Sequence, residues 1–152
     1  MATPQIIHRV GGAGVGTGVI LKNSTTLSVG DPLTIDSNGF LDIAATTGKI
    51  IGFCLEDVVG ASDNQTVAKV MPVYMEAARV RMIYQADQAC TQTDIGAYAD
   101  LATASTGACV LNLAAGSTGQ FLVEGFDPYG TGDTTLCVVV VAEPQQLAFT
   151  QD

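Results

Sequence analysis

The sequence predicts an all-β protein, folded as a small β-barrel or β-sandwich from two similar β units with a flexible N-terminal arm. Short runs rich in Val, Ile, Leu and Thr follow one another between residues 17 and 143, and clusters of Gly, Asp, Asn and Ser separate most of them. The pair Asn38-Gly39 is the strongest local signal for a hairpin. No long amphipathic helical pattern occurs, and residues 87–102 offer one helical turn at most.

The arm is expected to cover residues 1–16. Residues 11–18 read GGAGVGTG, with five glycines in eight positions. This stretch suggests a phosphate-binding loop, but it fits neither the GxGxxG pattern nor the P-loop pattern, which needs Gly-Lys followed by Ser or Thr. Because glycine is conformationally permissive, we interpret the stretch as a joint between the arm and a folded body. Residues 144–152 are expected to form a short C-terminal tail.

A single β domain is expected over residues 17–143, with quasi-repeats over about 17–76 and 77–143. In the first repeat the predicted strands are residues 17–23, 27–36, 40–44, 49–57 and 65–75. In the second repeat they are residues 77–85, 93–102, 108–115, 120–128 and 134–143. The stretch AARVRMIY, residues 77–84, alternates in part, which is typical of a strand with one buried and one open face.

One phrase occurs in both repeats. GKIIGFCLED begins at Gly48 and GQFLVEGFDP begins at Gly119, and each has a Gly, a short apolar run with a Phe, and an acidic or Asp-Pro stop. Matching the two repeats also aligns Gly30 with Gly96 and Gly39 with Gly107. The chain therefore contains one five-strand β motif twice, which predicts a pseudo-symmetric body and not a solenoid, since a solenoid needs more stacked units. The alternative is that β-hairpins in general resemble one another.

The composition indicates a large shared interface. Charged residues make up 14% of the chain and hydrophobic residues 47%, and charge is depleted at the cores of interfaces. The plainer alternative is a small Ala-, Thr- and Gly-rich domain with a mildly polar surface. A net charge of −9 argues against a nucleic-acid partner, because phosphate binding depends on clustered Lys and Arg. Only Arg79 and Arg81 lie close together, as a solvated face or as partners of a carboxylate on another protein.

Chemically active groups are few, and we expect no enzyme, no cofactor and no metal. The four cysteines form no CxxC pair, and the single His8 lies in the arm, away from any partner for catalysis. Glu56 and Asp57 are adjacent and point to opposite faces of a strand, so they are expected to solvate its end. The loop DPYGTGD, residues 127–133, supplies too few oxygens for calcium. No signal peptide and no apolar run longer than seven residues is found, so we expect an intracellular protein with reduced thiols and no membrane partner.

Residues 29–83 resemble the small capsid decoration, or cement, proteins of tailed bacteriophages. The similarity rests on VGDPLTIDSNGFLDIAATTGKIIGFCLEDVVG followed by TVAKVMPVYMEAARVRM, in which a GD, a later D and G, and an IIG recur at the family's spacing. It is weaker over residues 94–142 and absent from both tails. The resemblance implies a β-rich body, often trimeric, that sits on the outer capsid at symmetry axes and binds several major capsid subunits. It implies no catalytic residues.

The expected function is therefore that of a structural virion protein that binds the outer surface of a phage capsid and stabilises it, after assembly in the host cytoplasm. The alternatives are another β-rich phage component, such as a tail tube, fibre or adaptor part, or a β-barrel ligand-binding module. The expected partners are the major capsid protein and further copies of the chain, as a trimer. The residues expected to contact the capsid or a neighbouring subunit are the apolar and cationic residues of the two ends, Ile6, Ile7, Arg9, Val10, Leu147 and Phe149.

Overall fold

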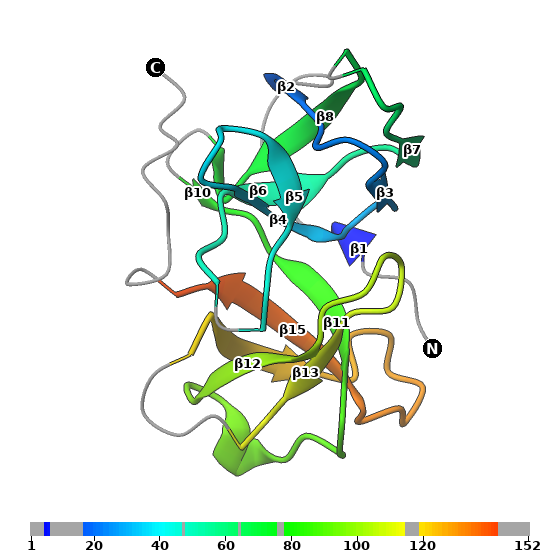
Figure 1. Ribbon diagram of the computed structural model, residues 1–152. Coiled ribbons are helices and arrows are strands. Elements are labelled where there is room, and N and C mark those ends of the chain that lie inside the picture. The colour runs from blue at the N-terminus through cyan, green and yellow to red at the C-terminus, as the bar shows by residue number, and fades with distance from the viewer. Residues whose placement is uncertain are drawn as a thin grey trace.

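The computed structural model describes residues 5–6, 17–46, 48–63, 65–75, 78–114 and 119–142 of the chain. The prediction of an all-β protein made of two similar β units is confirmed, and Figure 1 shows the two units stacked one above the other. We call residues 17–75 the N-terminal unit and residues 78–142 the C-terminal unit. The predicted single helical turn is a short 3₁₀ helix, η1, over Gln92–Asp94.

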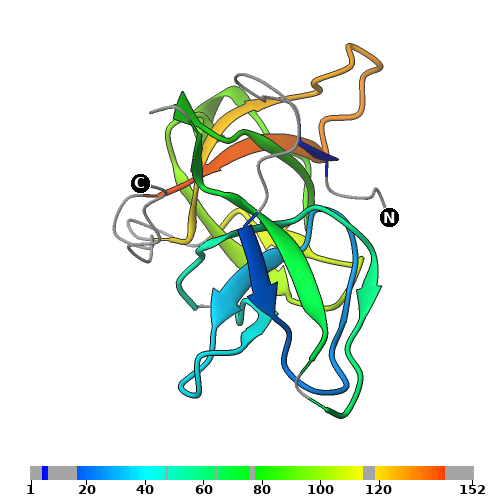
Figure 2. The same ribbon diagram turned by 90° about the horizontal axis from the view of Figure 1, so that it is seen from above.

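The N-terminal unit contains a five-stranded sheet. Its strands are β2 (Thr17–Ile20), β4 (Pro32–Ile35), β5 (Leu41–Ile43), β6 (Gly52–Cys54) and β8 (Val67–Pro72). They lie in the order β2-β8-β6-β4-β5, and the turned view in Figure 2 again places β2 beside β8. The two outer strands meet through one parallel bridge between Leu21 and Leu41. A separate pair, β3 (Thr26–Leu27) and β7 (Val58–Val59), lies beside this sheet.

The C-terminal unit is a closed five-stranded barrel. Its strands are β11 (Met82–Ala86), β12 (Tyr98–Thr103), β13 (Val110–Asn112), β14 (Phe121–Phe126) and β15 (Leu136–Val141). Their order is β11-β13-β12-β14-β15, and β15 pairs again with β11 to complete the ring. The strand β1 (Gln5–Ile6) is added to β11, and the hairpin of β9 (Tyr74–Met75) and β10 (Ala78–Arg79) connects the units.

The two units have the same topology and the same register. In both, the first strand is antiparallel to the fifth and parallel to the third, and the second and fourth strands are antiparallel neighbours. Equivalent residues, N-terminal unit first, are Thr17 and Met82, Gly18 and Ile83, Leu21 and Ala86, Pro32 and Tyr98, Leu41 and Leu111, Gly52 and Phe121, and Val70 and Val139. The repeat inferred from the sequence is thus present at the level of individual residue pairs.

Two of the three matched glycine pairs occupy equivalent turns. Gly30 and Gly96 have φ values of 86° and 82°, and Gly39 and Gly107 have 85° and 64°, in the left-handed region that favours glycine. The third match is shifted by two residues, because strand pairing makes Gly52 equivalent to Phe121 and so aligns Ile50, not Gly48, with Gly119. The apolar run that follows each glycine suggested the wrong register, since its length differs between the repeats.

Several long predicted strands are broken in the structure. Residues 65–75 contain β8 and β9 with Val73 between them, and residues 77–85 contain β10 and the start of β11. The breaks fall where the chain passes from one unit to the other. A run of apolar residues alone does not show such a change of direction, because Val73 and Val80 are buried like the strand residues around them.

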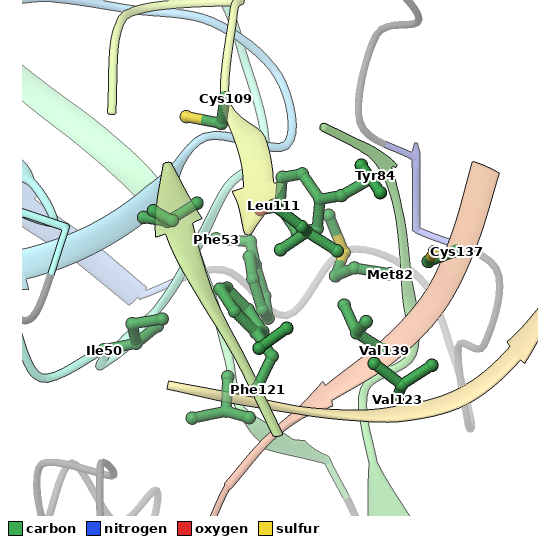
Figure 3. Packing of buried hydrophobic residues seen from close by; sticks show 14 of the residues in the cluster. Ile50, Phe53, Met82, Tyr84, Cys109, Leu111, Phe121, Val123, Cys137 and Val139 are labelled. Carbon is green, nitrogen blue, oxygen red and sulfur yellow. The ribbon is translucent and has the colours of Figure 1, made fainter. Parts of the chain in front are cut away.

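The hydrophobic core is continuous between the units. Ile50, Phe53 and Met71 of the N-terminal unit belong to the same buried cluster as Tyr84 and Phe121 of the C-terminal barrel. Figure 3 shows Phe53, Tyr84 and Phe121 among the buried side chains of this cluster. The Tyr84 ring lies 6.4 Å from Phe53 and 5.4 Å from Phe121, centroid to centroid, within the range of favourable aromatic contacts. A second, smaller cluster lies wholly in the N-terminal unit and includes Leu33.

Candidate interaction surface

The residues that the sequence marks for partner contact lie at the two ends of the chain. The structure places the backbone of Ile6 in β1, opposite Met82 of β11. The other five lie outside the described residues: Ile7, Arg9, Val10, Leu147 and Phe149. Their predicted role in binding a capsid or a neighbouring subunit stays a prediction. The described part of the molecule instead shows which polar groups are used within the chain and which surfaces are left for a partner.

The first such polar group is Asp31, which is buried between the units. Its carboxylate accepts a hydrogen bond from the Ser28 amide at 2.8 Å and another from the Gly107 amide at 2.9 Å. Gly107 belongs to the β12–β13 turn of the C-terminal unit, so the carboxylate joins the two units. Burial raises the pKa of Asp31 above its ordinary value of 3.8, and the two amide donors oppose that shift.

Tyr84 supplies a second connection. Its hydroxyl donates to the carbonyl oxygen of Gly30 at 2.6 Å, and the side chain is fully buried. Burial raises the pKa of this phenol well above 10.0, so the group remains a neutral donor. Thr106 makes a third connection, since its hydroxyl donates to the carbonyl oxygen of Thr26 at 2.5 Å.

Gln120 is the fourth connecting residue and has no exposed surface. Its side-chain nitrogen donates to the carbonyl oxygens of Ala45, at 2.8 Å, and Gly48, at 2.5 Å. Its side-chain oxygen accepts from the Leu101 amide at 3.0 Å. Among the described residues, every buried side-chain nitrogen and oxygen has a hydrogen-bond partner. These groups therefore connect the two units through hydrogen bonds within the chain.

Carboxylates on the surface also serve the chain's own backbone. Asp127 accepts from the amides of Thr131 and Gly132, at 2.9 and 3.0 Å, and so shapes the DPYGTGD loop. Asp57 accepts from the Val29 amide at 3.0 Å. Within the described ranges, no group of three or more His, Cys, Asp and Glu side chains is placed to hold a metal ion.

The four thiols are free and buried. Burial is the main cause that raises the pKa of each one, to about 12 for Cys109. A thiol with so high a pKa is a poor nucleophile at neutral pH, because the thiolate is the reactive form. The cysteines act here as small apolar residues of the core.

Two exposed ion pairs use cations within the chain. Lys22 contacts Asp42 at 2.6 Å and Arg81 contacts Glu124 at 2.7 Å. For Arg81 the sequence left open a solvated position or a carboxylate on a partner, and the observed carboxylate belongs to β14 of the same chain. Exposed pairs of this kind contribute about 0–1 kcal/mol to stability.

Three exposed apolar side chains lie on strands of the N-terminal unit. Ile20 of β2 and Val67 of β8 are directly paired across the two strands and are 43% and 52% exposed. Val59 of β7 is 71% exposed. In Figure 1, the top of β8 lies at the end of the N-terminal unit remote from the barrel, and β7 lies at the side of this unit beside β3. We call Ile20, Val59 and Val67 the outer apolar residues.

Comparison with known proteins adds no relative, since no protein-family model and no curated protein matches the chain. The described residues contain no helix with the length and apolar character needed to cross a membrane. The residues that sequence reasoning missed are Asp31, Tyr84 and Gln120. Asp31 stands in the GD of the cement-protein pattern and Gln120 follows the repeated Gly119, so the signal was a polar residue inside a recurring phrase.

Proposed function

We propose that the protein is a structural component of a tailed-phage virion that binds the outer surface of the capsid and stabilises it. The observation that carries the proposal is the resemblance of residues 29–83 to capsid cement proteins. Partners are major capsid subunits and further copies of this chain, as a trimer, and the location is the capsid surface. The protein has no catalytic role in this proposal.

The residues that carry the resemblance have structural roles in the N-terminal unit, and these roles support the inference from the family. Asp31 of the GD pair connects the units, and Asp36 accepts from the amides of Asn38 and Phe40, at 2.8 and 3.0 Å, to form the Asn-Gly turn. Gly52 of the IIG triplet lies so close to β8 that a β-carbon on it would be 2.2 Å from the Met71 carbonyl oxygen. The shared residues thus encode the architecture of the N-terminal unit, and the family's function is inferred through that architecture.

Physical properties of the body also support a structural role. The polar groups of the joint are hydrogen-bonded to partners inside the chain, and the carboxylate of Asp127 accepts from the amides of its own loop. A net charge of −9 with only 14% charged residues leaves large uncharged areas for contact with other subunits. Ile20 and Val67, which are directly paired, add a small exposed apolar area on β2 and β8.

The test is cryo-electron microscopy of phage particles that carry the gene, compared with particles from which the gene is deleted. The expected result is density outside the shell that disappears on deletion and into which the two stacked units fit. A second readout is the release of DNA from heated particles, which is expected at a lower temperature without the protein. Density in the tail or the fibres would support the alternative phage component, and absence of the chain from purified particles would overturn both.

A further inference from the structure

Comparison of the two units shows an unfilled strand position. In the C-terminal barrel, Met82 and Ile83 of β11 pair with β15 on one edge and with β1 on the other. The equivalent residues in the N-terminal unit are Thr17 and Gly18 of β2, which pair with β8 on the corresponding edge. Nothing pairs with their second edge among the residues that the structure describes.

An open strand edge presents unpaired backbone N–H and C=O groups and is a template for another extended segment. Because the two units share one register, the segment that fits β11 indicates what fits β2. That segment is Gln5–Ile6, which lies antiparallel to β11 with Gln5 opposite Ile83 and Ile6 opposite Met82.

The C-terminal tail contains a sequence similar to this segment. Residues 2–7 read ATPQII and residues 142–147 read AEPQQL, so Ala, Pro and Gln recur at the same positions and a branched apolar residue closes both. Pro-Gln occurs at these two places and nowhere else in the chain. Proline suits the start of an edge strand, since it has no N–H to leave unpaired and favours extended backbone.

We propose that residues 144–147 of a second copy of the chain add to β2 as an antiparallel strand. By the register of β1, Gln145 lies opposite Gly18 and Gln146 lies opposite Thr17. Main-chain hydrogen bonds supply the attraction, as in other strand additions, and Leu147 supplies apolar contact. Each copy gives one tail and accepts one, and this head-to-tail exchange closes into a ring when the rotation between copies allows it.

The source of the strand is a second copy because the tether within one chain is short. The amide of Ala142 is fixed to the Gln120 carbonyl oxygen at 2.9 Å in the C-terminal unit, and two residues separate Ala142 from Gln145. Three residue steps span about 10–11 Å when fully extended. Figure 1 shows the end of β15 in the lower unit and β2 in the upper one. The connection on the N-terminal side is longer, since ten residues separate β1 from β2.

Disulfide trapping tests the pairing. Thr17→Cys is made in one sample and Gln146→Cys in another, and the two are mixed and treated with oxidised glutathione, which accepts the two electrons and leaves as reduced glutathione. Residues directly opposite in antiparallel strands have β-carbons about 4.5–5.5 Å apart, close enough for a disulfide after small adjustment. The expected product on a non-reducing gel is a band of two chains that forms from the mixture and disappears on reduction.

The matched control pairs Gln146→Cys with Lys22→Cys. Lys22 is exposed and follows Thr17 by five residues, just after the end of β2. The control pair is expected to give several-fold less of the two-chain product, and wild-type protein is expected to give none, because its four thiols are buried. A Thr17→Cys/Gln146→Cys double variant that closes only within one chain would overturn the second-copy assignment. Equal trapping at Lys22 and Thr17, or no trapping at all, would overturn the strand pairing itself.

Truncation gives an independent measurement. A chain that ends at residue 143 is expected to keep the β-sheet circular dichroism of the full chain and to have a smaller mass in solution by light scattering. An unchanged mass, or a monomeric full-length chain, contradicts the exchange of tails. Neither experiment involves a capsid, so its outcome is independent of capsid binding; a monomeric full-length chain would also contradict the trimer of the proposed function, whereas loss of trapping in an oligomer would contradict the exchange of tails alone.

Discussion

Replacing Gln120 by Met removes the amide that connects the two units while retaining an unbranched side chain of similar length. Three hydrogen bonds are lost, two to the carbonyl oxygens of Ala45 and Gly48 and one from the Leu101 amide. Each such bond contributes about 0.5–1.5 kcal/mol net, and the greater apolarity of Met offsets part of the loss. We expect the free energy of unfolding to fall by about 2–4 kcal/mol.

The assay is urea denaturation of wild type and variant, followed by circular dichroism. Gln92→Met is the matched control, because Gln92 is exposed in η1 and its replacement is expected to change stability by less than about 0.5 kcal/mol. The wild type is expected to unfold in one transition, since the core is continuous across the joint. A loss for Gln120→Met no larger than that of the control would refute the argument that this side chain holds the units together.

Four further predictions concern packing, charge, thiols and the arm. Gly52→Ala is expected to lower the melting temperature strongly or to prevent folding. The control Gly125→Ala in β14 adds a β-carbon 3.8 Å from Val138 and is expected to melt near the wild-type temperature. Similar melting temperatures for the two variants would argue against the close approach of Gly52 in β6 to β8. Because burial raises the pKa of Asp31, the folded state binds the carboxyl proton more tightly than the unfolded chain does, so the contribution of Asp31 to stability falls as pH rises from 3.8 through the folded-state pKa. Denaturation at a series of pH values should show that Asp31→Asn lacks this fall in unfolding free energy. The same pH dependence in wild type and variant would contradict the reasoning. With the pKa of Cys109 at about 12 and all four thiols buried, a chromogenic disulfide reagent at neutral pH should label the native protein slowly and the unfolded protein at once, and fast labelling of native protein would contradict the burial. Deletion of residues 1–12 removes the two-residue pairing of β1 with β11. It is expected to lower the unfolding free energy by about 1–3 kcal/mol without changing the circular dichroism spectrum. An unchanged unfolding free energy would mean that β1 does not stabilise the barrel.

Local signals in the sequence were sufficient for the strand content and the repeat. Gly39 of the Asn38-Gly39 turn and the glycines at positions 30 and 96 have positive φ values, which glycine adopts easily. Because both units need the same turns, these residues recur in the same order. The closure of the C-terminal barrel was not predictable in detail, since β11 and β15 join residues more than fifty positions apart and no local pattern specifies such a pairing.

The roles of the polar residues of the joint were not predictable from the sequence, although Asp31 and Gln120 stand in recurring phrases. Asp31 follows a turn glycine and has the appearance of an ordinary loop carboxylate, and its burial depends on the Gly107 turn of the other unit. The connecting role of Gln120 depends on the carbonyl oxygens of Ala45 and Gly48, which only the tertiary fold brings beside it. The pairing of Gln5–Ile6 with β11 escaped notice for a related reason, because two residues are too few to show any periodicity.

The single bridge that closes the N-terminal unit has a consequence for where the molecule opens. The corresponding seam of the barrel contains two residue pairs, Gln85 with Val110 and Ala86 with Leu111, whereas Leu21 and Leu41 stand alone. Local opening starts where cooperative contacts are fewest, so we expect the N-terminal unit to open at this seam more readily than the barrel does. A ligand that binds only the closed form adds its own binding free energy to that half. Any subunit that contacts both sides of this seam is therefore expected to oppose opening of the N-terminal unit, and the stabilisation between the two partners is mutual.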